Sequence, residues 1–131
     1  MPKETPIAFD QLIGITLSEV LQAEKGSSMI TLLAACGRLF RMHHYDLCSE
    51  EVSLDDVEGD ISDIVGSPIT LAEKSTSPDT PDDVQDRLTQ LSQTWTFYRI
   101  GTVKGMVVLR WFGESNGYYS EEVDFVVLTE G

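Results

Sequence analysis

One stretch near the C-terminus, residues 94–128, constrains the fold of this chain more than any other part. It reads TWTFYRIGTVKGMVVLRWFGESNGYYSEEVDFVVL and holds both tryptophans and three of the four tyrosines. Aromatic and β-branched residues dominate it, as is typical of strands. Asn116-Gly117 predicts a two-residue hairpin turn, because such a turn needs positive φ at both central residues. Lys104-Gly105 predicts a second turn, so we expect a meander of three antiparallel strands.

The turn at Lys104-Gly105 sets the register of the first two strands. Val103 then faces Met106, and Arg99 lies directly opposite Arg110. Both faces of the meander carry large apolar side chains near its middle, so we expect both faces to be covered.

Two interpretations of the arginine pair remain open. Facing like charges destabilise a sheet unless a counter-charge lies between them, and Glu121 is the diagonal neighbour that would give Arg110 an ordinary surface ion pair. Alternatively, Arg99 and Arg110 form an anion-binding or peptide-binding patch, flanked by Trp95 and Tyr119.

The rest of the chain alternates between short apolar runs and turn residues. Residues 13–45 read as a second meander, and residues 60–65 as a short helix with Asp60 as N-cap. Short strands are expected at 52–57 and 69–72, and a second helix at 84–91. The sequence therefore predicts an α+β fold that is mainly antiparallel β, with two meanders, six to seven strands and one or two short helices. A curved sheet or a half-open barrel is the expected packing.

At 131 residues the chain is long enough for one domain with its own core. We expect residues 1–12 to form an N-terminal arm, residues 13–131 a single domain, and residues near 74–83 a mobile loop, because that segment is polar and interrupted by proline. The chain begins with no basic stretch followed by an apolar run, and its longest apolar run is far too short to cross a bilayer. With only Cys36 and Cys48 as thiols, we expect a reducing cytoplasm and no membrane.

The net charge of the chain limits which kinds of partner it can bind. Twenty-two acidic residues against nine basic ones give a net charge of −13, which repels nucleic-acid phosphates. No lysine or arginine occurs between Met42 and Glu73, a segment with nine acids. Two interpretations of this acidity remain open. The acidic residues keep the chain soluble, or they bind a basic surface on another protein. The acids that we expect to contact such a partner are Asp55, Asp56, Glu58, Asp60 and Asp63.

No catalytic motif passes a test of its structural context. Residues 113–117 match G-x-S-x-G, but a nucleophile elbow needs a helix after the serine and a histidine later in the chain. Here a strand is expected after the serine, and His44 is the last histidine. No glycine-rich phosphate loop is present, and we expect no cofactor.

The only cluster of metal-ligand residue types surrounds the two histidines. Adjacent histidines on a strand point to opposite faces, so at most one of them can join Cys48, and zinc requires three or four ligands. A solvated strand end is therefore favoured over a metal site. The weak metal candidates are His44, Cys48 and Glu50.

Four segments carry a resemblance: FRMHH…C.E.V, GDISDIVGSPI, TWTFYRIGTVKG and VLRWFGESNGYYSEEVDF. Over about residues 13–128 the chain resembles a family of small proteins, without assigned activity, that bacteriophages and prophages encode. Where that family carries Asp-Cys-Cys-Glu, residues 47–50 read Leu-Cys-Ser-Glu, which removes one thiol and one carboxylate. The departure puts a metal or dithiol role in doubt. The resemblance implies a phage accessory protein and supplies no reaction.

Three functions follow as hypotheses. The first is a non-enzymatic binding or inhibitor module, such as an anti-defence protein, that covers a basic surface of a bacterial host protein in the host cytoplasm. The second is a module that sequesters a nucleotide or anion, held by Trp95, Arg99, Arg110 and Tyr119. The third and weakest is a metal-binding protein. An oligomer is compatible with each of them.

Overall fold

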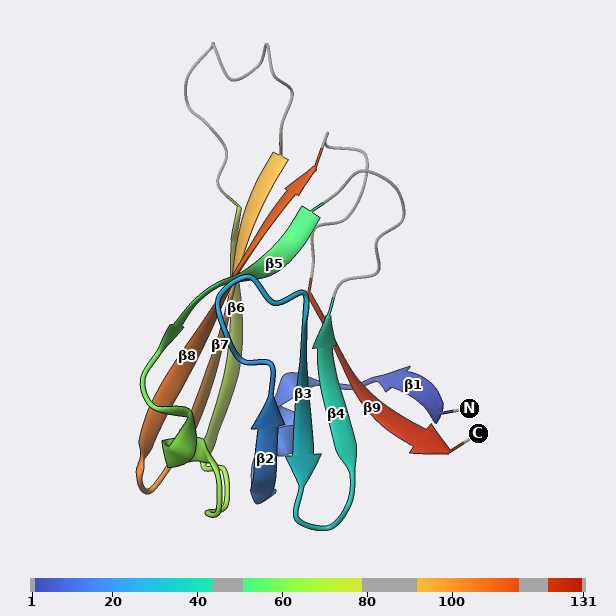
Figure 1. Cartoon of the computed structure of the whole chain (residues 1–131), viewed down its shortest axis with the longest axis vertical. Helices are drawn as coiled ribbons and strands as arrows, with labels where there is room; N and C mark the ends of the chain where they lie inside the picture. Colours follow the sequence, from blue (N-terminus) through green and yellow to red (C-terminus); the bar gives the residue numbers. More distant parts are fainter. Residues whose placement is uncertain (1, 44–50, 79–91, 116–122, 131) are drawn as a thin grey trace.

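Two antiparallel β-sheets make up the described part of the chain (Figure 1). The computed structural model describes residues 2–43, 51–78, 92–115 and 123–130. The five-stranded sheet has the spatial order β1 (Pro2–Pro6), β9 (Asp124–Glu130), β4 (Leu39–His43), β3 (Met29–Ala34) and β2 (Leu17–Leu21). The four-stranded sheet has the order β5 (Glu51–Glu58), β8 (Gly105–Ser115), β7 (Ser92–Thr102) and β6 (Leu71–Pro78).

The helical content of the described residues is limited to two 3-10 turns, η1 (Phe9–Leu12) and η2 (Ile61–Ile64). The prediction of a mainly antiparallel β fold is thus confirmed, with the strands divided between two sheets and no closed barrel. The short helix expected at 60–65 is η2, and Asp60 caps it by accepting a hydrogen bond from the Ser62 backbone. The helix expected at 84–91 lies outside the described residues. No described helix has the length and apolar character needed to cross a membrane.

The expected three-stranded meander is wrong in one respect, because β9 does not pair with β8. Instead β9 lies between β1 and β4 in the other sheet, while β5 occupies the place beside β8. Phe125 and Val126 of β9 are both buried, and a strand that is apolar on both faces is more stable in the interior of a sheet than at its edge. The Asn116-Gly117 turn lies outside the described residues.

The predicted register of the β7–β8 hairpin is also wrong. Thr102 pairs with Gly105, so the loop is Val103-Lys104, and Arg110 lies opposite Phe97. Thr102 selects this loop, since its hydroxyl oxygen accepts a hydrogen bond of 3.1 Å from the Lys104 backbone. The shift covers two positions in the pairing, so Arg99 and Arg110 still share one face of the sheet, although they no longer face each other directly.

The core lies between the two sheets. One face of β7 and β8 contributes buried side chains such as Tyr98 and Trp111, and the facing strands contribute Phe40 and Phe125. The turn η1 closes one side, because the Phe9 ring lies 4.5 Å from the Tyr98 ring and 5.1 Å from the Phe125 ring, centroid to centroid. These contacts join the aromatic side chains of the two inner faces to η1 in one cluster.

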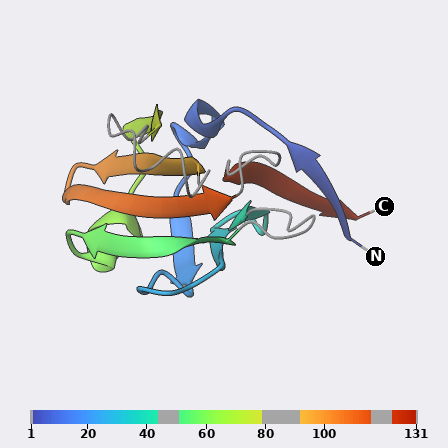
Figure 2. The same cartoon turned by 90° about the horizontal axis from the view of Figure 1, so that it is seen from above.

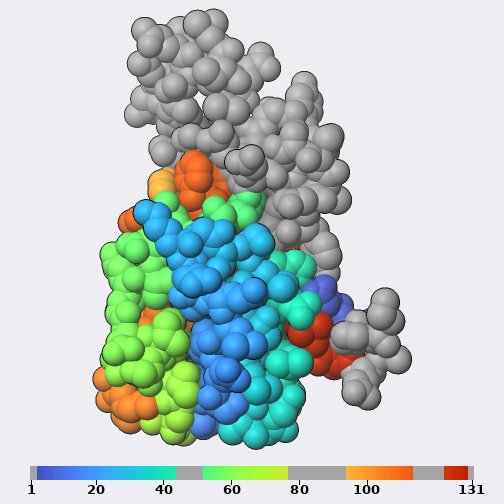
Figure 3. Space-filling model, viewed as in Figure 1, coloured from blue at the N-terminus to red at the C-terminus, as the bar shows by residue number. Residues whose placement is uncertain are grey.

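Backbone hydrogen bonds join the sheets at their margins. The loop between β2 and β3 lies against β5 (Figure 3), where Gly26 donates to the Leu54 carbonyl and Leu54 donates to the Ser27 carbonyl, both at 2.8 Å. At the other margin Gly14 donates to Ile69 at 2.7 Å and Ile69 donates to Ile15 at 2.9 Å. These bonds satisfy backbone groups that an isolated sheet edge would leave exposed.

The N-terminal segment, expected as an arm, contributes the edge strand β1, which pairs with β9 from Pro2–Glu130 to Pro6–Val126. The two ends of the chain therefore lie side by side (Figure 2). The Glu4 carboxylate oxygen Oε1 lies 2.7 Å from His43 Nε2 and accepts a hydrogen bond when that nitrogen is protonated, which links β1 to β4 across β9. Residues 74–78 of the loop expected near 74–83 belong to β6, and residues 79–83 lie outside the described residues.

Candidate functional site

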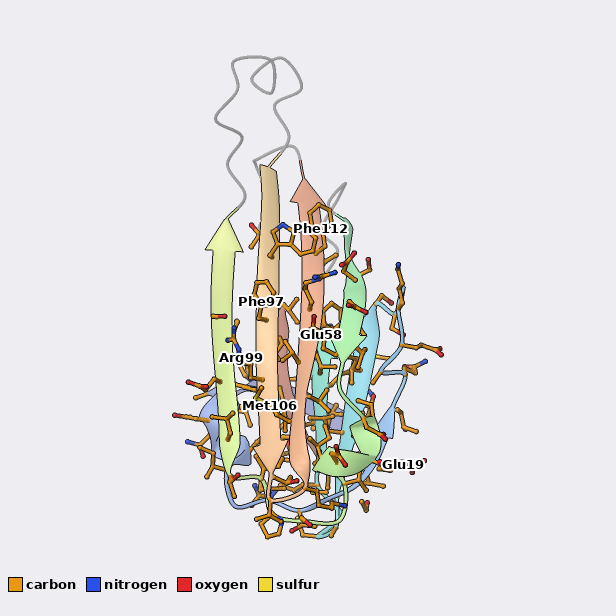
Figure 4. The ribbon with its side chains drawn as sticks, turned by 90° about the vertical axis from the view of Figure 1, so that its left-hand side faces the viewer. Glu19, Glu58, Phe97, Arg99, Met106 and Phe112 are labelled. Atoms are coloured by element: carbon orange, nitrogen blue, oxygen red, sulfur yellow. The ribbon has the colours of Figure 1, made fainter. Side chains whose placement is uncertain are left out.

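The outer face of the four-stranded sheet carries large side chains that do not point into the core. Along β7 and β8 burial alternates, with Tyr98 and Leu109 fully buried and their neighbours partly exposed. Figure 4 shows this outer face toward the viewer, with Phe97, Arg99, Met106 and Phe112 along the two central strands. We name it the aromatic–arginine face, made up of Trp95, Phe97, Arg99, Met106, Val108, Arg110 and Phe112.

Aromatic rings and guanidinium groups lie next to one another on this face. Trp95 and Phe112 are cross-strand partners with ring centroids 4.6 Å apart. The Arg110 Cζ lies 5.3 Å from the Trp95 ring centroid, and the Arg99 Cζ lies 5.9 Å from that of Phe97. Cation–π contacts at such distances hold the rings and the guanidinium planes in place. The result is a continuous surface of half-buried rings and aliphatic stems on β7 and β8.

Arg110 has a carboxylate partner on the neighbouring strand. Its Nε and Nη2 atoms donate to Asp55 Oδ2 at 2.9 and 2.6 Å, and Asp56 Oδ2 lies 3.8 Å from Nη2. Glu121, the partner expected from the sequence, lies outside the described residues. The pair depends on a β-bulge in β5, which inserts Asp55 between the Leu54–Trp111 and Asp56–Arg110 positions.

The sequence itself also indicates this bulge. The apolar residues that point inward from β5 are Val52, Leu54 and Val57. Val52 and Leu54 are two residues apart, whereas Leu54 and Val57 are three apart. A strand keeps such residues on one face only if it contains a bulge. That signal, together with the adjacent acids, would have identified the partner of Arg110.

Arg99 is engaged on the other side of the face. Its Nη1 donates to the Ser75 hydroxyl at 3.1 Å, and its cross-strand partner on β6 is Glu73, which is exposed. Of the residues predicted to form a ligand site, the structure brings Trp95, Arg99 and Arg110 onto one face. Tyr119 lies outside the described residues.

The five acids predicted to contact a partner follow one edge of the four-stranded sheet. We name them the acidic edge: Asp55, Asp56, Glu58, Asp60 and Asp63. The first three belong to the edge strand β5, Asp60 caps η2 and Asp63 lies within it. Hydrogen bonds from the Ser62 hydroxyl, at 2.8 Å, and from the Ser62 backbone, at 3.0 Å, lower the pKa of Asp60 below its usual value. Asp60 is therefore ionised at neutral pH.

The turn η2 is fixed to the tip of the β7–β8 hairpin. The Lys104 ammonium donates to the Ser62 carbonyl at 3.1 Å and also to the Val65 carbonyl. The Thr102 hydroxyl donates to the Asp63 carbonyl. These contacts hold Asp60 and Asp63, the two acids of the acidic edge at η2, beside the hairpin that carries the aromatic–arginine face. The two surfaces therefore form one continuous region.

The weak metal candidates His44, Cys48 and Glu50 lie outside the described residues. Within residues 2–43, 51–78, 92–115 and 123–130, no group of three histidine, cysteine or acidic side chains is arranged to hold a metal ion. His43 is described, and its ring nitrogen contacts Glu4. The described residues therefore add no metal centre to the candidate site.

These features define a class: a small, strongly acidic protein of two antiparallel sheets, with an aromatic–arginine face beside an acidic edge. Within that class the chain belongs to the family described as Domain of unknown function (DUF7448), which it matches over residues 10–125. No match was found among curated proteins or among solved structures.

Proposed function

We propose that the chain is a non-enzymatic binding module that attaches to a basic surface of another protein. The acidic edge and the aromatic–arginine face together would form the contact surface. The observation that supports this most directly is their adjacency, because carboxylates on β5 border half-buried rings on β7 and β8 (Figure 4). Trp, Phe, Met and Arg are enriched in the cores of protein interfaces, and charged residues surround them.

The partner would carry a complementary charge. A net charge of −13 raises the association rate with a basic surface and disfavours self-association and direct contact with nucleic acid. The resemblance to bacteriophage and prophage proteins suggests that the partner is a bacterial host protein in the host cytoplasm. An anti-defence inhibitor that covers a nucleic-acid-binding surface would have this chemistry.

Of the four edge strands among the described residues, three (β1, β2 and β5) carry features that disfavour strand addition, which favours contact through a face. β1 begins and ends with prolines, Pro2 and Pro6, which cannot donate to a further strand. β2 contains an irregularity between Leu17 and Glu19, and β5 contains the bulge at Asp55. Bulges and prolines at edges are the features by which β proteins prevent edge-to-edge pairing.

The small-ligand alternative receives less support. A phosphate or nucleotide site needs guanidinium groups with free donors directed at the ligand. Here the Asp55 carboxylate already binds Arg110 through Nε and Nη2, and this carboxylate would repel a phosphate at the same position. Ligand absorbance near 260 nm that co-purifies with the chain would favour this alternative over a protein partner.

The test is an affinity pull-down of the full chain from bacterial lysate at low and high salt, with a charge-reversal pair. Asp56→Lys with Glu58→Lys changes the acidic edge, and Glu19→Lys with Glu24→Lys makes the same change on the five-stranded sheet and its loop (Figure 4 shows Glu19 away from the aromatic–arginine face). Each pair moves the net charge from −13 by +4 to −9.

We expect one basic protein that is retained at low salt and lost at high salt, and about a tenfold or larger loss of affinity for the edge variant alone. An equal loss of affinity in both variants would show that net charge, and not the position of the acids, determines binding. Retention that neither variant changes would contradict the proposal.

A further inference from the structure

The aromatic–arginine face has the dimensions of a docking site for one helix. Its apolar stripe runs along β8 from Met106 to Phe112, with Trp95 and Phe97 beside it on β7. The six residue-to-residue steps from Met106 to Phe112 span roughly 20 Å, and β5 and β6 are three strand spacings, or about 14 Å, apart. A helix of about 13 residues is 20 Å long and 10–12 Å wide. One helix would therefore cover the stripe between the two outer strands.

The borders of the stripe are acidic on both sides. On β5, Glu58 lies opposite Val108 and is exposed. On β6, Glu73 lies opposite Arg99 and is also exposed. Asp55 and Asp56 both lie against Arg110, with carboxylate oxygens 2.6 and 3.8 Å from its Nη2. Glu58 and Glu73 are exposed and lie one at each margin. A helix with an apolar face and basic residues on both flanks would complement this arrangement.

We propose that the occupant of this face is a basic amphipathic α-helix of the partner protein, lying along β7 and β8. The inference rests on the proposed function and names the partner element that the face would bind. Leucine-like residues of the helix would contact Met106, Phe97 and the Trp95–Phe112 pair. Lysine or arginine residues on its flanks would pair with Glu58 and Glu73.

Arg110 and Arg99 are positioning residues in this arrangement. Arg110 is neutralised by Asp55 and lies over the Trp95 ring at 5.3 Å, so it supports the ring and repels a cationic helix less than a free guanidinium would. Arg99 lies against the Phe97 ring and donates to Ser75. Among the described residues, no other element lies in front of β7 and β8 in the view of Figure 4.

The two tryptophans provide a direct readout. Trp111 is completely buried in the core, whereas Trp95 is partly exposed on the face. The indole N–H signals of the full ¹⁵N-labelled chain would therefore separate binding at the face from a change in the core, and Trp95→Phe assigns them. The probe is a peptide of about 14 residues with leucine at helical spacing and lysine elsewhere.

We expect the leucine–lysine peptide to shift the Trp95 signal saturably and to leave the Trp111 signal in place. Two control peptides, one with serine for leucine and one with glutamate for lysine, should bind at least about tenfold more weakly. Met106→Ser should weaken binding by about five- to tenfold. Leu39→Ser, an exposed apolar residue on the other sheet, should change it less than twofold.

An unchanged Trp95 signal would overturn the inference. So would equal binding of the serine–lysine peptide, or tighter binding of an extended proline–lysine peptide, because these outcomes indicate charge alone or a different occupant. If the chain still retains a basic protein from lysate in a salt-sensitive way, only the helix assignment fails. If that retention is also absent, the proposed function fails with it.

Discussion

Gly59 has a backbone φ of 98°, and a β-carbon added there would stand 2.5 Å from the carbonyl oxygen of Met106. Two constraints therefore apply at this residue: a left-handed conformation, and a backbone neighbour that cannot rotate away. The residue lies between β5 and η2, where the chain leaves the acidic edge strand and turns across the end of β8. Glycine is required here for close approach as well as for conformation.

Only the first of these two constraints, the left-handed conformation, applies to Gly37. It has the same φ of 98°, but a β-carbon added there meets nothing within 4 Å. We expect Gly37→Ala to lower the free energy of unfolding by about 1 kcal/mol, and Gly59→Ala to lower it by about 1–3 kcal/mol more, because the β-carbon overpacks the Met106 carbonyl. Urea denaturation of both variants measures the difference. Equal losses would show that the contact with Met106 is relieved without cost.

At the scale of elements, the junction between η2 and the β7–β8 hairpin orients the acidic edge. Thr102 is buried, and its hydroxyl both donates to the Asp63 carbonyl and accepts from the Lys104 backbone. Its replacement by the isosteric valine leaves two polar groups without their partner. The hairpin loop and the position of η2 therefore depend on one side chain.

Thr102→Val should lower the free energy of unfolding by about 1–3 kcal/mol, because buried polar groups lose their hydrogen bonds. Thr70→Val is the matched control, since the Thr70 hydroxyl makes a single 3.3 Å bond to the Gly101 carbonyl and the residue is exposed. That control should lose less than about 0.5 kcal/mol. Thermal or urea unfolding of both variants checks the prediction, and a Thr102 variant as stable as the control would contradict it.

The strands themselves were largely predictable, whereas their partners were not. Short apolar runs bounded by turn residues identified the meander at residues 13–45, and Asp60 identified the start of η2, because these signals are local. The placement of β9 beside β4 depends on contacts between residues far apart in sequence, which a local pattern does not contain. At Val103-Lys104-Gly105, two loop positions satisfied the same pattern, and the Thr102 hydroxyl decided between them. In the candidate site, Trp95, Arg99 and Arg110 were correctly placed on one face, but the Asp55 partner required the bulge to be recognised.

At the scale of the whole molecule, the high negative charge acts on stability and on binding in opposite directions. Like charges repel within the folded chain, and salt screens that repulsion. The attraction between the acidic edge and a basic partner is screened by the same ions. Salt should therefore stabilise the free protein and weaken its complex.

The midpoint of thermal unfolding should rise between about 10 mM and 300 mM NaCl, as the Debye length falls from about 30 Å to below 8 Å. The variant Asp56→Lys with Glu58→Lys has two fewer negative and two more positive charges, which changes the net charge from −13 to −9, so its midpoint should rise less. Scanning calorimetry at both salt concentrations measures this. A midpoint that falls with salt in the unmodified chain would show that ion pairs such as Arg110–Asp55 outweigh the general repulsion.

The pairing of β1 with β9 places Pro2 opposite Glu130, and paired Cα atoms in antiparallel strands are roughly 5 Å apart. The ends therefore meet on the side of the molecule away from the aromatic–arginine face (Figures 1 and 4). A short glycine-rich linker could join them, and the chain could be reopened between β3 and β4 as a circular permutant. Such a permutant would keep every strand pair of the four-stranded sheet while its new ends lay in a surface turn.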